Sequence, residues 1–192
     1  MSLKKSSRPL ILVIGPASSG KSAWAEQLAR DSTKAVSYVA TAQENPEDPE
    51  WNAKIYQHVL RRPVEWKTLL VPVELAVTIQ AMQEEDCFLV DSLGTWLANV
   101  LDRGEEEWEA IAVNLLASLQ QARGEVILVA EETGWGLVPA YPLGRKFRDR
   151  LGNLTRRIGA IASTVYLVTG GYAIDLTQIG TPISHNIFKE LS

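Results

Sequence analysis

The chain has 192 residues, 46% of them hydrophobic, which is typical of one globular domain with a core of its own. Its 19 basic and 23 acidic residues give a net charge of −4, which argues against a nucleic-acid-binding protein because such proteins concentrate positive charge. The single cysteine, Cys87, excludes an intramolecular disulfide and a cysteine-based zinc site, and its apolar neighbours predict a buried, unreactive thiol. We therefore expect one domain over residues 1–192, with residues 1–8 as a flexible N-terminal extension.

The beginning of the chain resembles a secretory signal peptide only superficially. Basic residues precede the apolar run 10–14, but this run is too short for a signal peptide and leads directly into a phosphate-binding motif. No apolar stretch approaches the roughly 20 residues that a membrane-spanning helix needs. The sequence predicts a cytoplasmic protein that does not span a membrane.

The first predicted strand, 10–14, is followed directly by a complete phosphate-loop motif, G-x-x-x-x-G-K-S. Glycines at both ends of the loop permit backbone angles that a side chain would resist, and a helix opening at Lys21 would offer unpaired N–H groups to an anion. Lys21 would contact the β and γ phosphates of a nucleotide, and the Ser22 hydroxyl would bind Mg²⁺. The predicted phosphate-binding residues are Gly15, Pro16, Ala17, Ser18, Ser19, Gly20, Lys21 and Ser22.

The rest of the chain alternates between helical and extended patterns. In the first half of the chain we expect a helix over 23–30, a strand over 35–40, a loop over 41–48, a helix over 49–61, a strand over 66–71 and a helix over 73–83. Next come a strand over 88–90, a helix over 93–101, an exposed acidic connection over 102–107 and a helix over 108–122. The last part holds a strand over 126–130, a loop over 131–142, a helix over 143–162 and a strand over 165–168. In the tail, alternating Ile174, Leu176 and Ile179 suggest an edge strand.

This alternation predicts an α/β fold in which helices cover both faces of a mostly parallel sheet. In such sheets ligands bind at the carboxyl ends of the strands, so the polar residues there are candidates: Thr41, Asp91, Glu131 and Glu132. Asp91 would bind Mg²⁺ opposite Ser22, since this cation needs only one or two protein oxygens. The alternative is that Asp91 only caps the following helix.

Helix 49–61 carries one of the two histidines of the chain, His58. An apolar stripe that we expect to face inward lies on the same side of this helix and consists of Trp51, Ile55 and Val59. Neutral imidazole is a competent nucleophile near pH 7, and the nearby Arg61 and Arg62 could bind nucleotide phosphates. An isolated helical histidine is more often exposed or packed without function, so the residues alone leave both interpretations open.

Further blocks of residues occur in a distinctive order along the chain. They are Tyr38-Val39-Ala40-Thr41-Ala42, Lys54-Ile55 with His58 and Arg62-Pro63, Trp66 with Thr68, Leu89-Val90-Asp91-Ser92-Leu93 with Trp96-Leu97 and Asn99, and Gly134-Trp135-Gly136-Leu137-Val138-Pro139 with Leu143, Arg145, Phe147-Arg148-Asp149 and Gly152. Together with the phosphate loop, and up to about Gly171, they resemble the bifunctional adenosylcobinamide kinase/adenosylcobinamide-phosphate guanylyltransferase family of cobalamin biosynthesis.

The resemblance implies a RecA-like P-loop fold, a homotrimer and two reactions. In the first, ATP or GTP phosphorylates the aminopropanol hydroxyl of adenosylcobinamide. In the second, GMP passes from GTP through a guanylylated histidine to that phosphate, which gives adenosylcobinamide-GDP and pyrophosphate. His58 falls on this histidine and would be catalytic together with Lys21. The other residues assigned to nucleotide binding are Val39, Ala40, Thr41, Val59, Leu60, Arg61, Arg62 and Asp91, with Mg²⁺ at Ser22 and Asp91.

The chain departs from the family pattern at four places. Shortly after the Trp-x-Thr element, where the family has a glutamate, this chain has Leu70, and before the late Glu-x-Gly it has Glu131 in place of an asparagine. In the phosphate loop Ser18 replaces an arginine of the family, and on the late helix Thr155-Arg156 replaces an Asn-Gln pair. The Leu70 departure concerns one contact to the nucleotide, and none of the four removes a group that the chemistry requires.

Two alternatives remain from the motifs alone. Another P-loop small-molecule kinase would share Lys21, Ser22 and Asp91 but would give His58 no role. A switch GTPase is suggested by the D-x-x-G pattern that begins at Asp91. Such GTPases read guanine with an N-K-x-D segment late in the chain, and its absence from this sequence disfavours the switch.

Overall fold

The structure is a computed structural model that describes residues 9–43, 45–136 and 138–183; of Lys54 and His58 it describes only the backbone. The predicted extension 1–8 and the second histidine, His185, lie outside the described residues. The strands are β1 (Leu10–Gly15), β2 (Ala35–Ala40), β3 (Lys67–Leu70), β4 (Asp86–Asp91), β5 (Glu125–Glu131), β6 (Thr164–Thr169) and β7 (Tyr172–Asp175). The helices are α1 (Lys21–Arg30), α2 (Pro49–Arg61), α3 (Leu75–Ala81), α4 (Leu93–Asn99), α5 (Glu105–Gln121), α6 (Pro142–Ile161) and α7 (Leu176–Ile179).

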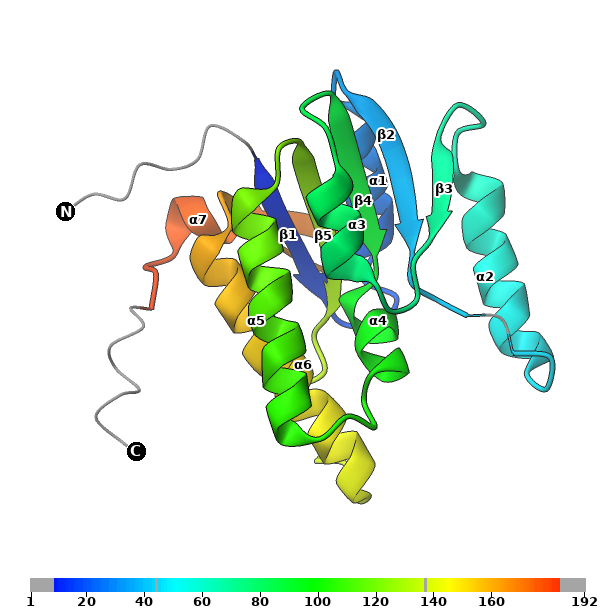
Figure 1. Cartoon of the computed structure of the whole chain (residues 1–192), viewed down its shortest axis with the longest axis vertical. Coiled ribbons are helices and arrows are strands. Elements are labelled where there is room, and N and C mark those ends of the chain that lie inside the picture. The colour runs from blue at the N-terminus through cyan, green and yellow to red at the C-terminus, as the bar shows by residue number, and fades with distance from the viewer. Residues whose placement is uncertain (1–8, 44, 137, 184–192) are drawn as a thin grey trace.

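The strands form one seven-stranded sheet in the order β3-β2-β4-β5-β1-β6-β7 (Figure 1). All neighbouring strands pair in parallel except β6 and β7, which pair antiparallel at one edge. The predicted mostly parallel α/β sheet is therefore confirmed. The carboxyl ends of β1, β4 and β5 lie side by side, because Gly15 pairs with Glu131 and Asp91 with Val129.

Helices cover both faces of this sheet (Figure 1). α1 packs on one face, where Ala25 and Ala29 join a core cluster with inward side chains of the central strands. α3, α4, α5 and α6 pack on the other face, around Trp96 and Trp108, whose ring centroids are 6.1 Å apart. Both clusters draw on the same strands: Leu89 belongs to the first, whereas its neighbours along β4 belong to the second. This follows from the alternation of side chains along a strand, and it explains why the central strands are apolar throughout.

Two elements differ from the sequence-based expectation. The predicted acidic connection over residues 102–107 is wrong in its second half, because α5 begins at Glu105 and takes three glutamates into its first turn. Acidic side chains interact favourably with the positive end of a helix, and Glu105 also bonds to Arg150 at 3.0 Å. The predicted edge strand exists as β7, but Leu176 and Ile179 belong to α7 instead of extending the strand.

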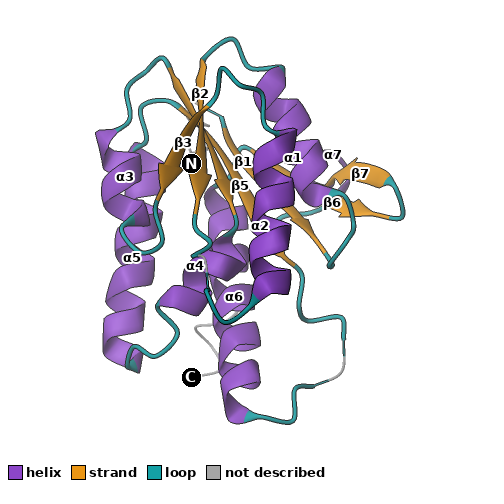
Figure 2. Ribbon diagram, turned by 90° about the vertical axis from the view of Figure 1, so that its right-hand side faces the viewer, coloured by secondary structure: helices purple, strands orange, loops and turns teal. Residues whose placement is uncertain are grey.

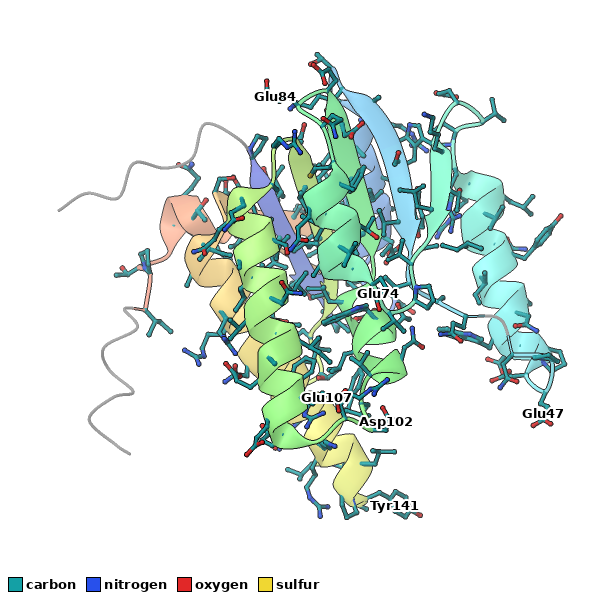
Figure 3. The ribbon with its side chains drawn as sticks, in the orientation of Figure 1. Glu47, Glu74, Glu84, Asp102, Glu107 and Tyr141 are labelled. Carbon is teal, nitrogen blue, oxygen red and sulfur yellow. The ribbon has the colours of Figure 1, made fainter. Side chains whose placement is uncertain are left out.

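The helix α2 has the predicted bounds but lies beside the edge strand β3, apart from the body of the protein (Figures 1 and 2). Trp51 and Ile55 are half-buried, but the predicted inward stripe is wrong at Val59, whose side chain is 45% exposed. The reason is that the short strand β3 offers no broad apolar surface for a helix to cover. The loop before α2 lies at the right-hand edge of the view in Figure 3, marked by Glu47, and the helix runs upward from there.

Cys87 is fully buried in β4 and forms no disulfide, as predicted. Burial, and then the negative charge of Glu125, raises the pKa of its thiol to about 12. The thiol is therefore protonated at neutral pH, and the protonated form is a poor nucleophile.

Candidate functional site

The phosphate loop connects β1 to α1 at the carboxyl end of the sheet, as the motif predicts. Gly15 is required by packing, because a Cβ there would lie 2.4 Å from the carbonyl oxygen of Val168. Ser18 and Gly20 have φ angles of 58° and 91°, in the left-handed region that glycine adopts without strain. These turns fold the loop back on itself, so that the amide of Ser19 donates to the carbonyl of Pro16 at 3.3 Å.

The loop gathers hydrogen-bond donors where α1 begins. Gly20 caps the helix without any side-chain bond to its first amides, and the buried Ser19 hydroxyl has no partner among the described residues. Lys21 is only 9% exposed, and its Nζ donates to the Pro16 carbonyl at 3.3 Å. Amide, hydroxyl and ammonium donors at one helix N-terminus suit an anion such as a phosphate group.

Asp91, the last residue of β4, lies directly beside this loop. The Ser22 hydroxyl donates to Asp91 Oδ1 at 3.4 Å, and the Tyr38 hydroxyl donates to Asp91 Oδ2 at 2.8 Å. Mg²⁺ binds oxygens at about 2.0–2.1 Å in an octahedron, so neighbouring ligands are about 3 Å apart. The hydroxyl of Ser22 and the carboxylate of Asp91 therefore fit this ion in both chemistry and separation.

Arg62 follows the last residue of α2 and attaches this end of the helix to the sheet. Its guanidinium carbon lies 3.6 Å from the centroid of the Tyr38 ring, and its Nη1 donates to Thr68 Oγ1 at 3.3 Å. Its Nε is buried without a partner within the described parts of the chain. The neighbouring Arg61 is exposed, and its carbonyl accepts from Arg30 of α1 at 3.3 Å.

His58 lies in the last turn of α2, and its side chain lies outside what the structure describes. Because α2 runs from the carboxyl end of the sheet back along β3, this turn is not brought next to the phosphate loop (Figure 1). Val59 and Leu60 beside it are 45% and 59% exposed. The structure thus joins the phosphate loop, Ser22 and Asp91 in one place and holds the turn with His58 in another.

The three predicted nucleotide contacts at the end of β2 are Val39, Ala40 and Thr41, and all three are buried. The Thr41 hydroxyl donates to the Ser92 carbonyl at 2.8 Å and accepts from the Ser92 amide at 2.9 Å. These residues hold the carboxyl ends of β2 and β4 together. At 0%, 8% and 0% exposed, they can contribute to a nucleotide site chiefly by holding its other residues in place.

Glu131 holds the beginning of α4, a role that its sequence position did not predict. Its carboxylate accepts from the Ser92 hydroxyl at 2.5 Å and from the Gly94 amide at 3.0 Å. Gly94 leaves room for it, because a Cβ there would lie 2.1 Å from a Glu131 oxygen. A carboxylate at a helix N-terminus is electrostatically favourable, so the departure from asparagine at this position has a structural explanation.

Replacing Glu131 with alanine should lower the free energy of unfolding by about 2 kcal/mol, because two donors lose a charged acceptor. For a chain of this size that corresponds to a decrease in Tm of about 4–8 °C, measurable by calorimetry. Glu132→Ala is the matched control, since Glu132 accepts only from the Gly134 amide two residues away. Equal changes in Tm for the two variants would contradict the capping role of Glu131.

Glu26 is a buried charge that the sequence pattern also left unnoticed. It lies in α1, four residues after Ser22, and is 4% exposed. Burial raises the pKa of its carboxyl, Arg61 opposes this increase, and Asp91 adds to it. One carboxylate oxygen lies 4.0 Å from Arg30, and the other has no hydrogen-bond partner within the described residues. Charges from α1, α2 and β4 therefore meet beneath the phosphate loop.

Comparison with known proteins gives one consistent result. Residues 11–176 match the family model described as cobinamide kinase / cobinamide phosphate guanyltransferase. The chain is 41% identical over 171 residues to the bifunctional adenosylcobalamin biosynthesis protein CobP of Pseudomonas aeruginosa, which covers 86% of this chain and 95% of that protein. It is 34% identical over 182 residues to the bifunctional adenosylcobalamin biosynthesis protein CobU of Salmonella typhimurium, which covers 87% of this chain and 99% of that protein.

Solved structures share the fold at low sequence identity. A protein from Pyrococcus horikoshii OT3 matches with a TM-score of 0.53 at 8% identity, over 92% of this chain and 91% of that one. A prototypical ATPase from the type III secretion system of pathogenic bacteria matches with a TM-score of 0.54 at 11% identity, over 94% of this chain and 60% of that one. At these identities the likeness concerns the fold alone, and it confirms the RecA-like arrangement.

Proposed function

The chain belongs to the cobinamide kinase / cobinamide phosphate guanyltransferase family, and on this premise we propose which of its residues carry out each of the two reactions. It is a bifunctional kinase and guanylyltransferase of cobalamin biosynthesis, and its substrates are nucleoside triphosphates and cobinamide compounds. The observation that carries the assignment is the convergence of the phosphate loop, Ser22 and Asp91 at one place within the matched region.

For the kinase reaction, we assign the transferred phosphoryl group to the phosphate loop. The hydroxyl of adenosylcobinamide attacks the γ-phosphorus of ATP or GTP, the bond to the β-phosphate oxygen breaks, and the hydroxyl proton leaves. Lys21 and the backbone N–H groups of the phosphate loop, to which Pro16 contributes none, bind the phosphates and offset their charge. The free donors at the start of α1 support this role.

For the guanylyl transfer, we assign the nucleophile to His58. A ring nitrogen attacks the α-phosphorus of GTP and pyrophosphate leaves. The phosphate of adenosylcobinamide phosphate then attacks the same phosphorus, the P–N bond breaks, and adenosylcobinamide-GDP forms. Imidazole suits both steps, because it is nucleophilic when neutral and leaves readily once protonated. The family match covers α2, which supports the assignment.

For the nucleotide-binding surface, we propose the residues that the sequence indicates: 15–22, 39–41, 59–62 and Asp91. Arg61 ends α2 and Arg62 follows it against the ring of Tyr38, and we propose that their positive charges face the phosphates of GTP. Leu70 ends β3 and is 77% exposed, so it is accessible at the position where a nucleotide contact was expected from the family.

For the metal, we propose that Ser22 and Asp91 hold Mg²⁺ and that the ion offsets charge on the triphosphate. Asp91→Asn keeps the shape of the side chain and removes its charge. We expect a higher Mg²⁺ requirement and a loss of rate of about 10²-fold. A Mg²⁺ titration of initial rates measures both, and an unchanged Mg²⁺ requirement would mean that Asp91 does not hold the metal.

The experiment that tests the guanylyl-histidine proposal uses GTP labelled at the α-phosphate. Purified protein incubated with it, without cobinamide phosphate, should retain covalent label after denaturation. GTP labelled at the γ-phosphate should leave none, because pyrophosphate departs. Adding adenosylcobinamide phosphate should discharge the adduct into product, and a stable adduct that is not discharged would contradict its role as an intermediate.

For the assembly, we propose a homotrimer. Exposed apolar side chains gather along α2 and β3 at one edge of the sheet, namely Tyr56, Val59, Leu60, Val64 and Leu70, and Tyr172 and Ile174 lie on the opposite edge strand. A contact between two different edges is heterologous and closes into a ring when its rotation permits. Light scattering on purified protein measures the mass directly.

For localisation, we propose the cytoplasm. Within the described residues, no helix is long and apolar enough to cross a membrane. The substrates of the family, ATP and GTP, are cytoplasmic nucleotides. Fractionation of cells with an antibody to the native chain tests this proposal.

A further inference from the structure

Tyr38 occupies the centre of the site, although neither reaction uses it. It lies in β2, is 2% exposed, and packs among the core residues beneath α1. One end of this side chain reaches Asp91 beside the phosphate loop, and the face of its ring carries Arg62 at the end of α2. The two parts of the site that the fold holds apart are thus joined through one residue.

The hydroxyl of Tyr38 determines how the carboxylate of Asp91 points. It donates to Oδ2 at 2.8 Å, so that Oδ1 faces the Ser22 hydroxyl, which lies 3.4 Å away. A tyrosine hydroxyl carries its proton at neutral pH and therefore acts as the donor in this bond. A charge-assisted bond of this kind restrains a carboxylate more strongly than a neutral one.

The ring of Tyr38 determines where α2 ends. The guanidinium of Arg62 stacks on it at 3.6 Å, and no other described aromatic ring is so close to a cation. Stacking on a desolvated ring is among the stronger cation–π arrangements. None of the described side chains of α2 is buried. The contacts at this end of the helix include the Arg62 stack, the Arg62 bond to Thr68, the Arg61 carbonyl and the attraction between Arg61 and Glu26.

We propose that Tyr38 is a positioning residue for both reactions: its hydroxyl orients Asp91 toward the metal, and its ring anchors the helix that carries His58. The inference rests on the proposed roles of Asp91 and His58. It assigns separable functions to two parts of one side chain, and this makes it testable by substitutions that remove one part at a time.

The first test is Tyr38→Phe, which removes the hydroxyl and keeps the ring. Binding of a GTP analogue that cannot be cleaved between its α- and β-phosphates is measured by calorimetry with Mg²⁺ and with EDTA, so that no guanylyl transfer to the protein interferes. We expect the increase in affinity that Mg²⁺ gives to fall by about tenfold, which corresponds to one lost charge-assisted hydrogen bond. The affinity measured in EDTA should change little. Tyr172→Phe, at an exposed position on β7, is the control. An unchanged Mg²⁺ effect in Tyr38→Phe would overturn the role of the hydroxyl.

The second test concerns the ring and follows amide hydrogen exchange over α2. Arg62→Met should accelerate exchange in the last turn of α2 about fivefold or more, because the stack is lost, whereas Tyr38→Phe should leave it within twofold. Thr68→Val removes only the other side-chain contact of Arg62 and should have the smaller effect. Unchanged exchange in Arg62→Met, or an equal effect from Thr68→Val, would overturn the role of the ring.

Asp91→Asn separates failure of this inference from failure of the proposed metal site. If it removes the Mg²⁺ effect on GTP binding while Tyr38→Phe does not, Asp91 holds the metal without help from Tyr38, and the inference is wrong. If neither variant alters the effect, the metal site itself lies elsewhere. The exchange experiment needs no nucleotide, so it decides the role of the ring in either case.

Discussion

Replacing His58 with alanine should abolish transfer of GMP to adenosylcobinamide phosphate and leave a substantial part of the kinase activity. Guanylyl transfer in two steps needs a nucleophile that attacks the α-phosphorus and then leaves, and alanine offers none. The kinase reaction moves the γ-phosphoryl group directly to a hydroxyl through positioning, Lys21 and the metal. Separate assays of cobinamide phosphate and of adenosylcobinamide-GDP measure the two activities in one preparation.

The adduct itself provides a second measurement. A phosphoramidate on histidine is labile to acid and resistant to base, whereas a phosphoserine ester is resistant to acid and labile to base. The stability of the α-labelled protein therefore identifies the bond. Gln57→Ala, at the exposed position beside His58 in the same helix, is the matched control and should retain both activities and the adduct. An adduct that persists in His58→Ala would assign the nucleophile elsewhere, with His185 next to be tested. Equal loss of both activities would mean that His58 builds the site without reacting.

Local sequence signals were sufficient to predict most elements of the fold. The strand 35–40 and the helix 49–61 have the predicted bounds, because an apolar β-branched run and a Pro-started helix with a terminating Pro63 are both encoded by neighbouring residues. The start of α5 was not predicted, because three glutamates suit a solvated loop and a helix N-terminus equally. Arg150, distant in sequence, favours the helix by bonding to Glu105 and to the carbonyl of Leu101, and Arg103 bonds to Glu107.

The predicted burial of Val59 in α2 was another error, and its cause lies in tertiary structure. An apolar stripe predicts which face of a helix is buried only if a broad surface is available to cover it. β3 is a short strand at the edge of the sheet, so Val59 and Leu60 remain exposed. Nothing in residues 49–61 encodes this, since the strand order is set by the pairing of the whole sheet.

In the candidate site, residues within a local motif were predictable and residues that act across the fold were not. The phosphate loop is one contiguous pattern, and Asp91 follows from the rule that ligands bind at the carboxyl ends of parallel strands. Tyr38 and Glu131 instead act through Asp91 and Ser92, residues far from them in sequence. A tyrosine inside an apolar strand predicts only burial, and its hydrogen bond depends on β2 and β4 being neighbours.

Replacing Lys21 with methionine should collapse both reactions together, in contrast to the separation expected for His58. Methionine keeps the length of the side chain and removes the charge that offsets the triphosphate. Since Lys21 is 9% exposed, few water molecules could replace its ammonium group. We expect the kinase rate to fall by about 10²–10³-fold. GTP binding should weaken as well, and guanylyl transfer should fall with it because both reactions start from a bound triphosphate.

The design of this test depends on a control that keeps the fold. Among the described residues Lys21 bonds only to the Pro16 carbonyl of its own loop. Its loss removes no described hydrogen bond between elements, and Tm should change little. Lys34→Met removes a lysine at the opposite end of the sheet, where it donates to the Glu84 carbonyl, and should leave both reactions near the wild-type rate. Near-normal turnover in Lys21→Met would refute the assignment of the phosphate loop. Loss of the kinase reaction alone would mean that GTP binds elsewhere for guanylyl transfer, near the exposed turn that carries His58 and not at the start of α1.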